Sequence, residues 1–305
     1  MSPKLPGAVL ADAVLSQGTV PLPAAKAIKS IKARNDQVVA QFRRDVAQRR
    51  QIAREQAAMM APIIRLIRQD ERAVAAIEKN QRRIAAQRRP KITFPKVHQR
   101  IEPHVRAGSI LTVAGPPYTW EWGEHSDADQ TTWGTTVAYK RAPDARFNAT
   151  FNAGNGGSAW ASAGVGRYFV PVGTGNSTWM RIGLYAPCEY HWQASSTLEV
   201  AHTRGFIAIY VTSWSPNGSD ERVEVDRIMD PWLWSHGTSW YQNHSDGGSA
   251  HYPSDTYFLA SAARRYAIWA WCHTSGDAST GYIAHSYAHG SISVALPFMV
   301  FEQWT

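Results

Sequence analysis

The sequence predicts an α+β fold with segregated parts: a long N-terminal helix of coiled-coil character, followed by an antiparallel β-sandwich of jelly-roll-like type. Residues 1–100 hold 21 Lys and Arg against 7 Asp and Glu, whereas residues 101–305 hold 11 against 17. All 13 Trp and all 12 Tyr follow residue 100. The apolar period changes from helical to alternating near the same point. Two chemically different parts therefore meet there.

The first 23 residues predict an extended N-terminal arm, because four prolines and two glycines interrupt any regular element. Residues 24–89 contain no Gly and one Pro, which predicts a basic helical stalk or anchor with a kink at Pro62. Apolar residues recur at alternating spacings of four and three, typical of a coiled-coil seam that also includes polar Asn35 and Arg49. We expect a homo-oligomer, with a trimer favoured, through Ile31, Val38, Phe42, Ile52, Ile63, Leu66, Ile77 and Ile84.

Residues 90–108 predict an extended linker, because Pro90, Pro95 and Pro103 disfavour a helix. Residues 109–305 predict a β-sandwich head of nine or ten short strands. The stretch from Gly205 to Trp214 is apolar on both faces, which indicates a central strand. Ser215–Asp220 has the composition of a tight turn, and Pro297 indicates a bulge or an edge position.

Paired arginines distinguish the helical part from the rest of the chain. A guanidinium binds phosphate or carboxylate through two parallel hydrogen bonds. We expect these side chains to bind an acidic protein surface; nucleic acid and anionic membrane are less favoured partners, and a solvated coiled-coil face is the alternative without a partner. The residues are Arg43, Arg44, Arg49, Arg50, Arg54, Arg82, Arg83, Arg88 and Arg89.

Aromatic residues gather beside polar residues between positions 232 and 252. Aromatic faces next to amides and carboxylates suit sugar rings, which offer C–H patches and hydroxyls together. Core and hairpin packing is the competing interpretation, since large rings stabilise cross-strand pairs. The candidate glycan-binding residues are Trp232, Trp234, Trp240 and Tyr241.

No catalytic or cofactor motif is present in the sequence: it lacks a G-x-S-x-G elbow, an H-E-x-x-H motif and a phosphate-binding loop. His285 and His289 are four residues apart, but in an extended chain this spacing is about 13 Å, too long for one metal ion. Cys188 and Cys272 lie in apolar segments, which favours buried thiols. We expect a non-enzymatic protein with no cofactor or metal; a carbohydrate-active enzyme or lectin-like module is the alternative.

The order of arm, basic helix and β head resembles that of fibre, spike and decoration proteins of phages and related particles. In such proteins an arm anchors to a larger assembly, a stalk oligomerises and a head faces outward. The resemblance implies a structural or attachment role. The N-terminal apolar run is short and contains Asp12, so we expect synthesis in the cytoplasm without export by the general secretory route, and assembly into a virion or similar particle.

Overall fold

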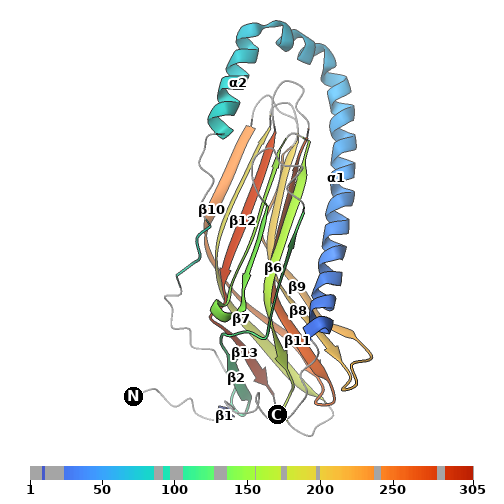
Figure 1. Ribbon diagram of the computed structural model, residues 1–305, viewed down its shortest axis with the longest axis vertical. Coiled ribbons are helices and arrows are strands. Elements are labelled where there is room, and N and C mark those ends of the chain that lie inside the picture. Colours follow the sequence, from blue (N-terminus) through green and yellow to red (C-terminus); the bar gives the residue numbers. More distant parts are fainter. Residues whose placement is uncertain are drawn as a thin grey trace.

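The computed structural model describes residues 9–10, 24–85, 92–96, 106–126, 136–154, 156–172, 177–196, 200–236, 242–279 and 286–304. Two helices, α1 (Ala24–Gln69) and α2 (Glu71–Ala85), precede the main sheets. Figure 1 shows α1 along one side of an elongated β-sandwich, the helical chain turning over one end, and α2 on the opposite side. The prediction of a long helix followed by an antiparallel β-sandwich is confirmed.

The sandwich consists of two sheets, here called sheet A and sheet B. Sheet A contains β1 (Val9–Leu10), β2 (Ile110–Ala114), β4 (Val137–Arg141), β5 (Arg146–Gly154), β7 (Thr178–Ser196), β10 (Gln242–Ala260), β12 (Tyr287–Ala295) and β13 (Phe298–Gln303). Sheet B contains β3 (Trp120–His125), β6 (Ser158–Phe169), β8 (Ala201–Trp214), β9 (Arg222–His236) and β11 (Arg265–Ala278). All pairings are antiparallel except the short β1–β2 pair.

Strand β7 organises sheet A. One edge of β7 pairs with β10 over its whole length. The other edge pairs first with β13, over residues 180–185, and then with β12, over residues 188–195. The chain leaves β12 at Ala295 and enters β13 at Phe298, so Pro297 lies at the interruption that its missing N–H favours. The last strand therefore lies inside the sheet, between β2 and β7.

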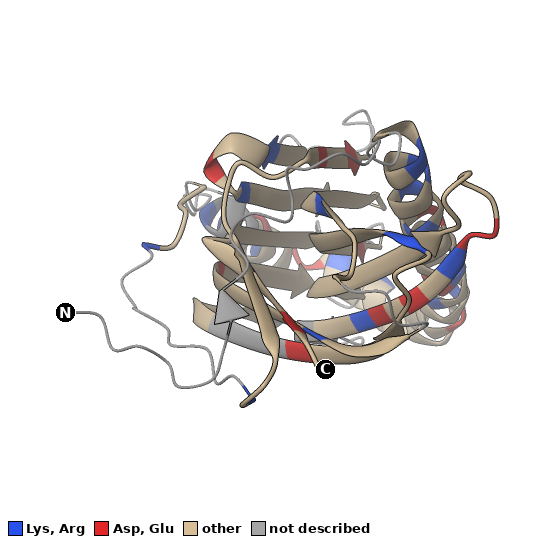
Figure 2. Cartoon of the chain, turned by 90° about the horizontal axis from the view of Figure 1, so that it is seen from below, with Lys and Arg blue, Asp and Glu red and all other residues tan. Residues whose placement is uncertain are grey.

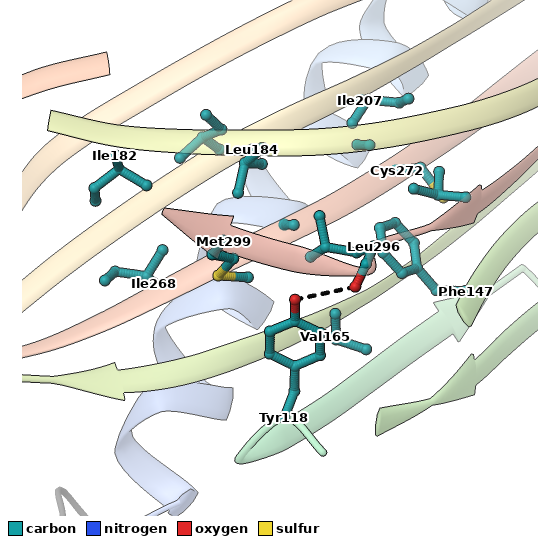
Figure 3. Close-up of a cluster of buried hydrophobic side chains, with 14 of the residues drawn as sticks. Tyr118, Phe147, Val165, Ile182, Leu184, Ile207, Ile268, Cys272, Leu296 and Met299 are labelled. Atoms are coloured by element: carbon teal, nitrogen blue, oxygen red, sulfur yellow. Dashed lines mark hydrogen bonds between the residues drawn. The ribbon is translucent and has the colours of Figure 1, made fainter. Parts of the chain in front are cut away.

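The core fills the space between the two sheets (Figure 3). Even-numbered residues of β7, from Met180 to Cys188, point into this core and are fully buried. Tyr118 lies among them, and its hydroxyl donates a hydrogen bond of 3.0 Å to the Leu296 carbonyl. Both cysteines are buried free thiols, as expected, and burial raises the pKa of Cys188 to about 12.

The first half of α1 covers the outer face of sheet B. Ala27 and Ile31 are fully buried against an aromatic cluster of that face, and Val38 packs at its margin. The cluster includes Trp120, Trp122, Phe206, Tyr210, Trp214, Trp269 and Trp271. Ile31 and Val38, expected in an intermolecular seam, thus have partners within their own chain. Their spacing identified a buried face but not what buries it.

Polar contacts fasten α1 along the same face. Arg49 forms an ion pair of 2.7 Å with Asp277 of β11, whose side chain is only 4% exposed. Arg50 donates a hydrogen bond of 2.5 Å to the Gly156 carbonyl. Nearer the start of the helix, Lys32 pairs with Glu124. A polar residue in an apolar helix face is costly unless it is paired, and the sheet supplies the pairs.

The predicted single helix over residues 24–89 is divided at Asp70. The Asp70 carboxylate accepts hydrogen bonds from the backbone N–H groups of Arg72 and Ala73, which makes it the N-cap of α2. Pro62 lies inside α1, seven residues before its end at Gln69.

Candidate ligand-binding groove

A polar groove lies on sheet A, on the side of the sandwich opposite α1. Its volume is about 580 Å³. The lining comes from β7, β10 and β12, with Ile92 and Thr93 of the linker as one wall. The lining includes the polar side chains of Glu189, His191, Ser245, Asp246, Ser249, Ser291 and Ser293.

Strand register explains how these residues meet. Ser249, Glu189 and Ser293 form one row across three neighbouring strands. Gly247, His191 and Ser291 form the next row on the same face. Directly paired residues share a face of a sheet, so the polar side chains of the two rows stand together. Gly247 has no side chain, which leaves space beside the His191 ring.

Hydrogen bonds fix the floor and one wall of the groove. The Asn148 amide donates to the hydroxyls of Ser293, at 2.9 Å, and Ser291, at 3.2 Å. Thr150 and Ser291 share a further hydrogen bond of 2.8 Å. On the opposite side, the Thr93 hydroxyl donates to Glu189. The groove is therefore preorganised rather than a gap between mobile side chains.

The titratable groups of the groove give it an acidic, hydrogen-bonding character. Burial lowers the pKa of His191, while the nearby Asp246 carboxylate opposes that shift. His191 is therefore neutral at neutral pH, with one ring nitrogen as donor and the other as acceptor. Its Nδ1 atom is buried and has no hydrogen-bond partner among the described residues. Two carboxylates, a neutral imidazole and several hydroxyls can together bind a polyhydroxylated ligand.

Of the candidate glycan-binding residues, Trp232 lies outside the groove. Trp232 is only 6% exposed, and its indole N–H donates a hydrogen bond of 3.1 Å to Thr203. Gly205 of β8 pairs with Trp232 of β9 and makes room for its ring, because a Cβ at position 205 would lie 2.2 Å from a ring atom of Trp232. Trp232 therefore belongs to the core, which corrects its assignment as a surface platform. Trp234 lies on β9, its side chain outside the described set, and Trp240 and Tyr241 lie outside the described residues.

The arginines of the helical part divide into two groups. Arg49 and Arg50 contact the sandwich, as described above. Arg43, Arg44, Arg54 and Arg83 are exposed. Arg82 lies in α2, its side chain outside the described set, and Arg88 and Arg89 lie outside the described residues. Figure 2 shows blue segments on the helical ribbon beside the sheets.

The apolar seam residues also divide. Phe42 is buried, and Ile63 and Ile77 are half-buried. Ile52 is 43% exposed and Leu66 is 66% exposed, with Met59, 73% exposed, between them. Ile84 lies in α2, its side chain outside the described set.

The described residues contain no cluster of three metal-ligating side chains. His289 is buried, and its Nδ1 lies 2.8 Å from the Asn152 amide oxygen; His285 lies outside the described set. Within the described helices, no stretch is both long and apolar enough to cross a bilayer.

Comparison with known proteins gives structural neighbours only. No protein family model and no curated protein sequence matches the chain. A carbohydrate-binding module of the β-sandwich superfamily aligns with 62% of this chain and 56% of its own, at 10% identity and a TM-score of 0.20. A structure of the infectious bursal disease virus Gx strain aligns with 64% and 35%, at 12% identity and a TM-score of 0.17. The chain thus spans about half and about a third of these two, and scores this low carry no argument about function.

Proposed function

We propose that this chain is a non-enzymatic attachment protein whose β-sandwich binds a carbohydrate in the groove on sheet A, while its basic helical part joins a larger assembly such as a virus particle. The groove carries this proposal, since it combines a volume of about 580 Å³ with acidic, hydroxyl and imidazole groups held by the strand register. Such groups accept and donate the many hydrogen bonds that a sugar requires.

Removing the charge of Glu189 should weaken binding. In Glu189→Gln we expect sugar affinity to fall about tenfold or more, because hydrogen bonds to a charged acceptor are stronger than neutral ones. Because Glu189 also accepts from Thr93, Ser249→Trp provides an independent variant that fills the groove with a bulky ring from the same row. Binding is measured by screening an array of oligosaccharides and then by calorimetry on the hits.

Glu221→Gln is the matched control, because Glu221 is an exposed carboxylate remote in register from the groove. Wild-type affinity in Glu189→Gln and Ser249→Trp would contradict the assignment. The enzyme alternative has its own readout, because the groove lining includes two carboxylates, Glu189 and Asp246. If the wild type releases reducing sugar and Glu189→Gln does not, the groove is the active site of a hydrolase rather than a binding site.

The helical part supports self-association through its far end. Ile52, Met59 and Leu66 are exposed at intervals of seven residues, so they form one stripe along α1. The neighbouring residues on that stripe are mostly uncharged, for example Gln48 and Pro62. Copies of the chain would contact one another along this stripe, with a trimer favoured. The exposed Arg43 and Arg54 lie on another face of α1, where they would remain free to bind an acidic partner.

Charging the stripe should therefore lower the oligomeric state. We expect Met59→Glu/Leu66→Glu to convert the native oligomer to monomers, because the substitution places carboxylates in an apolar contact. Ala47→Glu/Ala61→Glu adds the same charge at exposed positions on another face of α1 and should leave the mass unchanged. Light scattering in physiological salt measures the mass. A monomeric wild type would exclude this contact.

A further inference from the structure

A second group of aromatic side chains lies on the outer face of sheet A, at the end of β7 away from the groove. Core residues of β7, β10 and β13 include Met180, Phe258 and Met299. Because side chains alternate along a strand, the residues next to them point outward. The outward set contains Trp179, Tyr185, Tyr257 and Phe298, with Trp304 directly after β13.

Three of these rings form a platform, defined here as Trp179, Tyr257 and Trp304. Trp179 is 51% exposed and Tyr257 is 48% exposed. The rings of Tyr257 and Trp304 lie 5.7 Å apart, and the Trp304 backbone N–H donates to the Trp179 carbonyl at 3.0 Å. Leu259, which pairs with Trp179 and is 53% exposed, extends the apolar surface.

The stability of the fold does not explain why these aromatic rings are exposed on one face. Aromatic rings contribute most when they are fully buried, and large exposed apolar groups gathered on one face mark binding surfaces. The charges beside them are balanced: Arg181 lies 3.0 Å from Glu302 and 3.7 Å from Asp255. The Arg106 guanidinium lies 4.9 Å from the centre of the Trp304 ring and holds it in place. The surface is therefore rigid, aromatic and nearly neutral.

Platform and groove lie on one face of one strand pair. Along β7 they are separated by ten residues, from Trp179 to Glu189, which is about 33 Å of extended chain. Tyr185 and Pro187 lie between them on the same face and are half-buried. We propose that the groove and the platform are two subsites for one linear, neutral polysaccharide that runs along β7, an inference that rests on the carbohydrate-binding function proposed above.

The chemistry of the two ends decides the class of ligand. Ring faces bind the C–H faces of sugar units, and the groove binds hydroxyls. The carboxylates of Glu189 and Asp246 disfavour an anionic glycan, which would place like charges together. Linkage of two subsites through one chain raises affinity without any new contact, so affinity should grow with chain length until both subsites are occupied.

The test compares chain lengths in platform variants. The probes are β-1,4-linked oligosaccharides of glucose, mannose and N-acetylglucosamine, each with two and with eight units. In the wild type we expect the eight-unit chain to bind about tenfold or more tightly than the two-unit chain. In Trp179→Ala/Tyr257→Ala the eight-unit chain should bind only as tightly as the two-unit chain, whose affinity should not change.

Two controls accompany this variant. Trp179→Phe/Tyr257→Phe keeps the rings and should retain most of the length dependence. Val223→Ala removes an equally exposed apolar side chain, 56% exposed, from sheet B and should behave like the wild type. Equal affinity for both lengths in the wild type, unchanged in the platform variant, would overturn the second subsite and leave the groove function standing. Absence of binding both to these probes and to the oligosaccharide array would overturn both proposals.

Discussion

Arg49→Met is expected to destabilise the protein by about 3–5 kcal/mol, because it leaves the buried Asp277 carboxylate without its partner. Arg49 donates to Asp277 Oδ1 from two nitrogens, Nη2 at 2.7 Å and Nε at 3.1 Å, so the pair is held by more than one hydrogen bond. Burial raises the pKa of Asp277, and the Arg49 charge opposes that shift. Without the guanidinium the carboxylate keeps only the His202 ring, whose Nδ1 lies 3.7 Å from Asp277 Oδ1, or must take up a proton.

The partner variant should show a smaller effect. Asp277→Asn leaves an arginine that is 18% exposed and can reach solvent, whereas Asp277 is 4% exposed. In the double variant Arg49→Met/Asp277→Asn we expect a coupling energy of about 2 kcal/mol, since neither residue then lacks a charged partner. Urea unfolding measures all three free energies.

Arg43→Met is the matched control, because Arg43 is an exposed arginine of the same helix. Its effect should stay within about 0.5 kcal/mol. Limited proteolysis within residues 24–50 should become faster in Arg49→Met and not in Arg43→Met. Equal stability of the two variants would show that the ion pair does not hold α1 against sheet B.

Acidification below about pH 6.5 is expected to cost several kcal/mol of stability through two buried histidines. Burial lowers the pKa of His202 and of His273 to about 3. The charges of Arg49 and Arg204 act in the same direction on His202, and the charge of Arg204 does so on His273. The unfolded chain binds a proton at each histidine near its usual pKa of 6.5, while the folded chain does not. Folding therefore loses stability as pH falls from 6.5 toward 3, and the loss is absent above that window.

The arrangement around His273 explains its neutral form. The Ser162 hydroxyl donates to the Asn35 amide oxygen at 2.7 Å, so the 2.8 Å contact between His273 Nδ1 and Ser162 requires Nδ1–H as donor. His273 Nε2 is buried with no hydrogen-bond partner among the described residues. A second proton would have to enter this site beneath α1, between the rings of Trp160 and Phe206.

Each histidine should lower the unfolding free energy by about 2 kcal/mol between pH 6.5 and 5, because one pH unit corresponds to about 1.36 kcal/mol. The measurement is the unfolding free energy against pH for the wild type, His273→Asn and His202→Asn. Below pH 6.5 the unfolding free energy of each variant should fall less steeply with pH than that of the wild type. Above pH 7 the two curves should be parallel, even if the variant is less stable overall. If the curve of a variant is parallel to the wild-type curve at every pH, that histidine does not contribute to the loss of stability in acid.

Sequence periodicity predicted the main elements because each depends on local pattern. The Ser215–Asp220 turn is present between β8 and β9, with Gly218 at a φ of 79°. The α1 face containing Ile31, Asn35 and Phe42 was also identified. What buries that face depends on contacts with strands more than 80 residues away in sequence, and no local pattern specifies those.

The candidate site was harder to predict for the same reason. Alternation shows that Trp232 and Trp234 share a face, but not whether that face is turned to the core. Glu189, Ser249 and Ser293 belong to three strands, and only the pairing register brings them together. The one local signal was the Gly247–Gly248 pair, which marks a stretch of β10 without side chains.

The position of β13 inside sheet A has a consequence for biosynthesis. The residues that fill the gap between β2 and β7 are made after every other strand of the two sheets, so neither the sheet nor the core beneath it can close before β13 has been synthesised. Helix α1 is made before the tryptophan surface that it covers, which is assembled from β3, β8 and β11, the last of which ends at Ala278. Chaperone binding to the nascent chain during this long interval would protect both surfaces from aggregation.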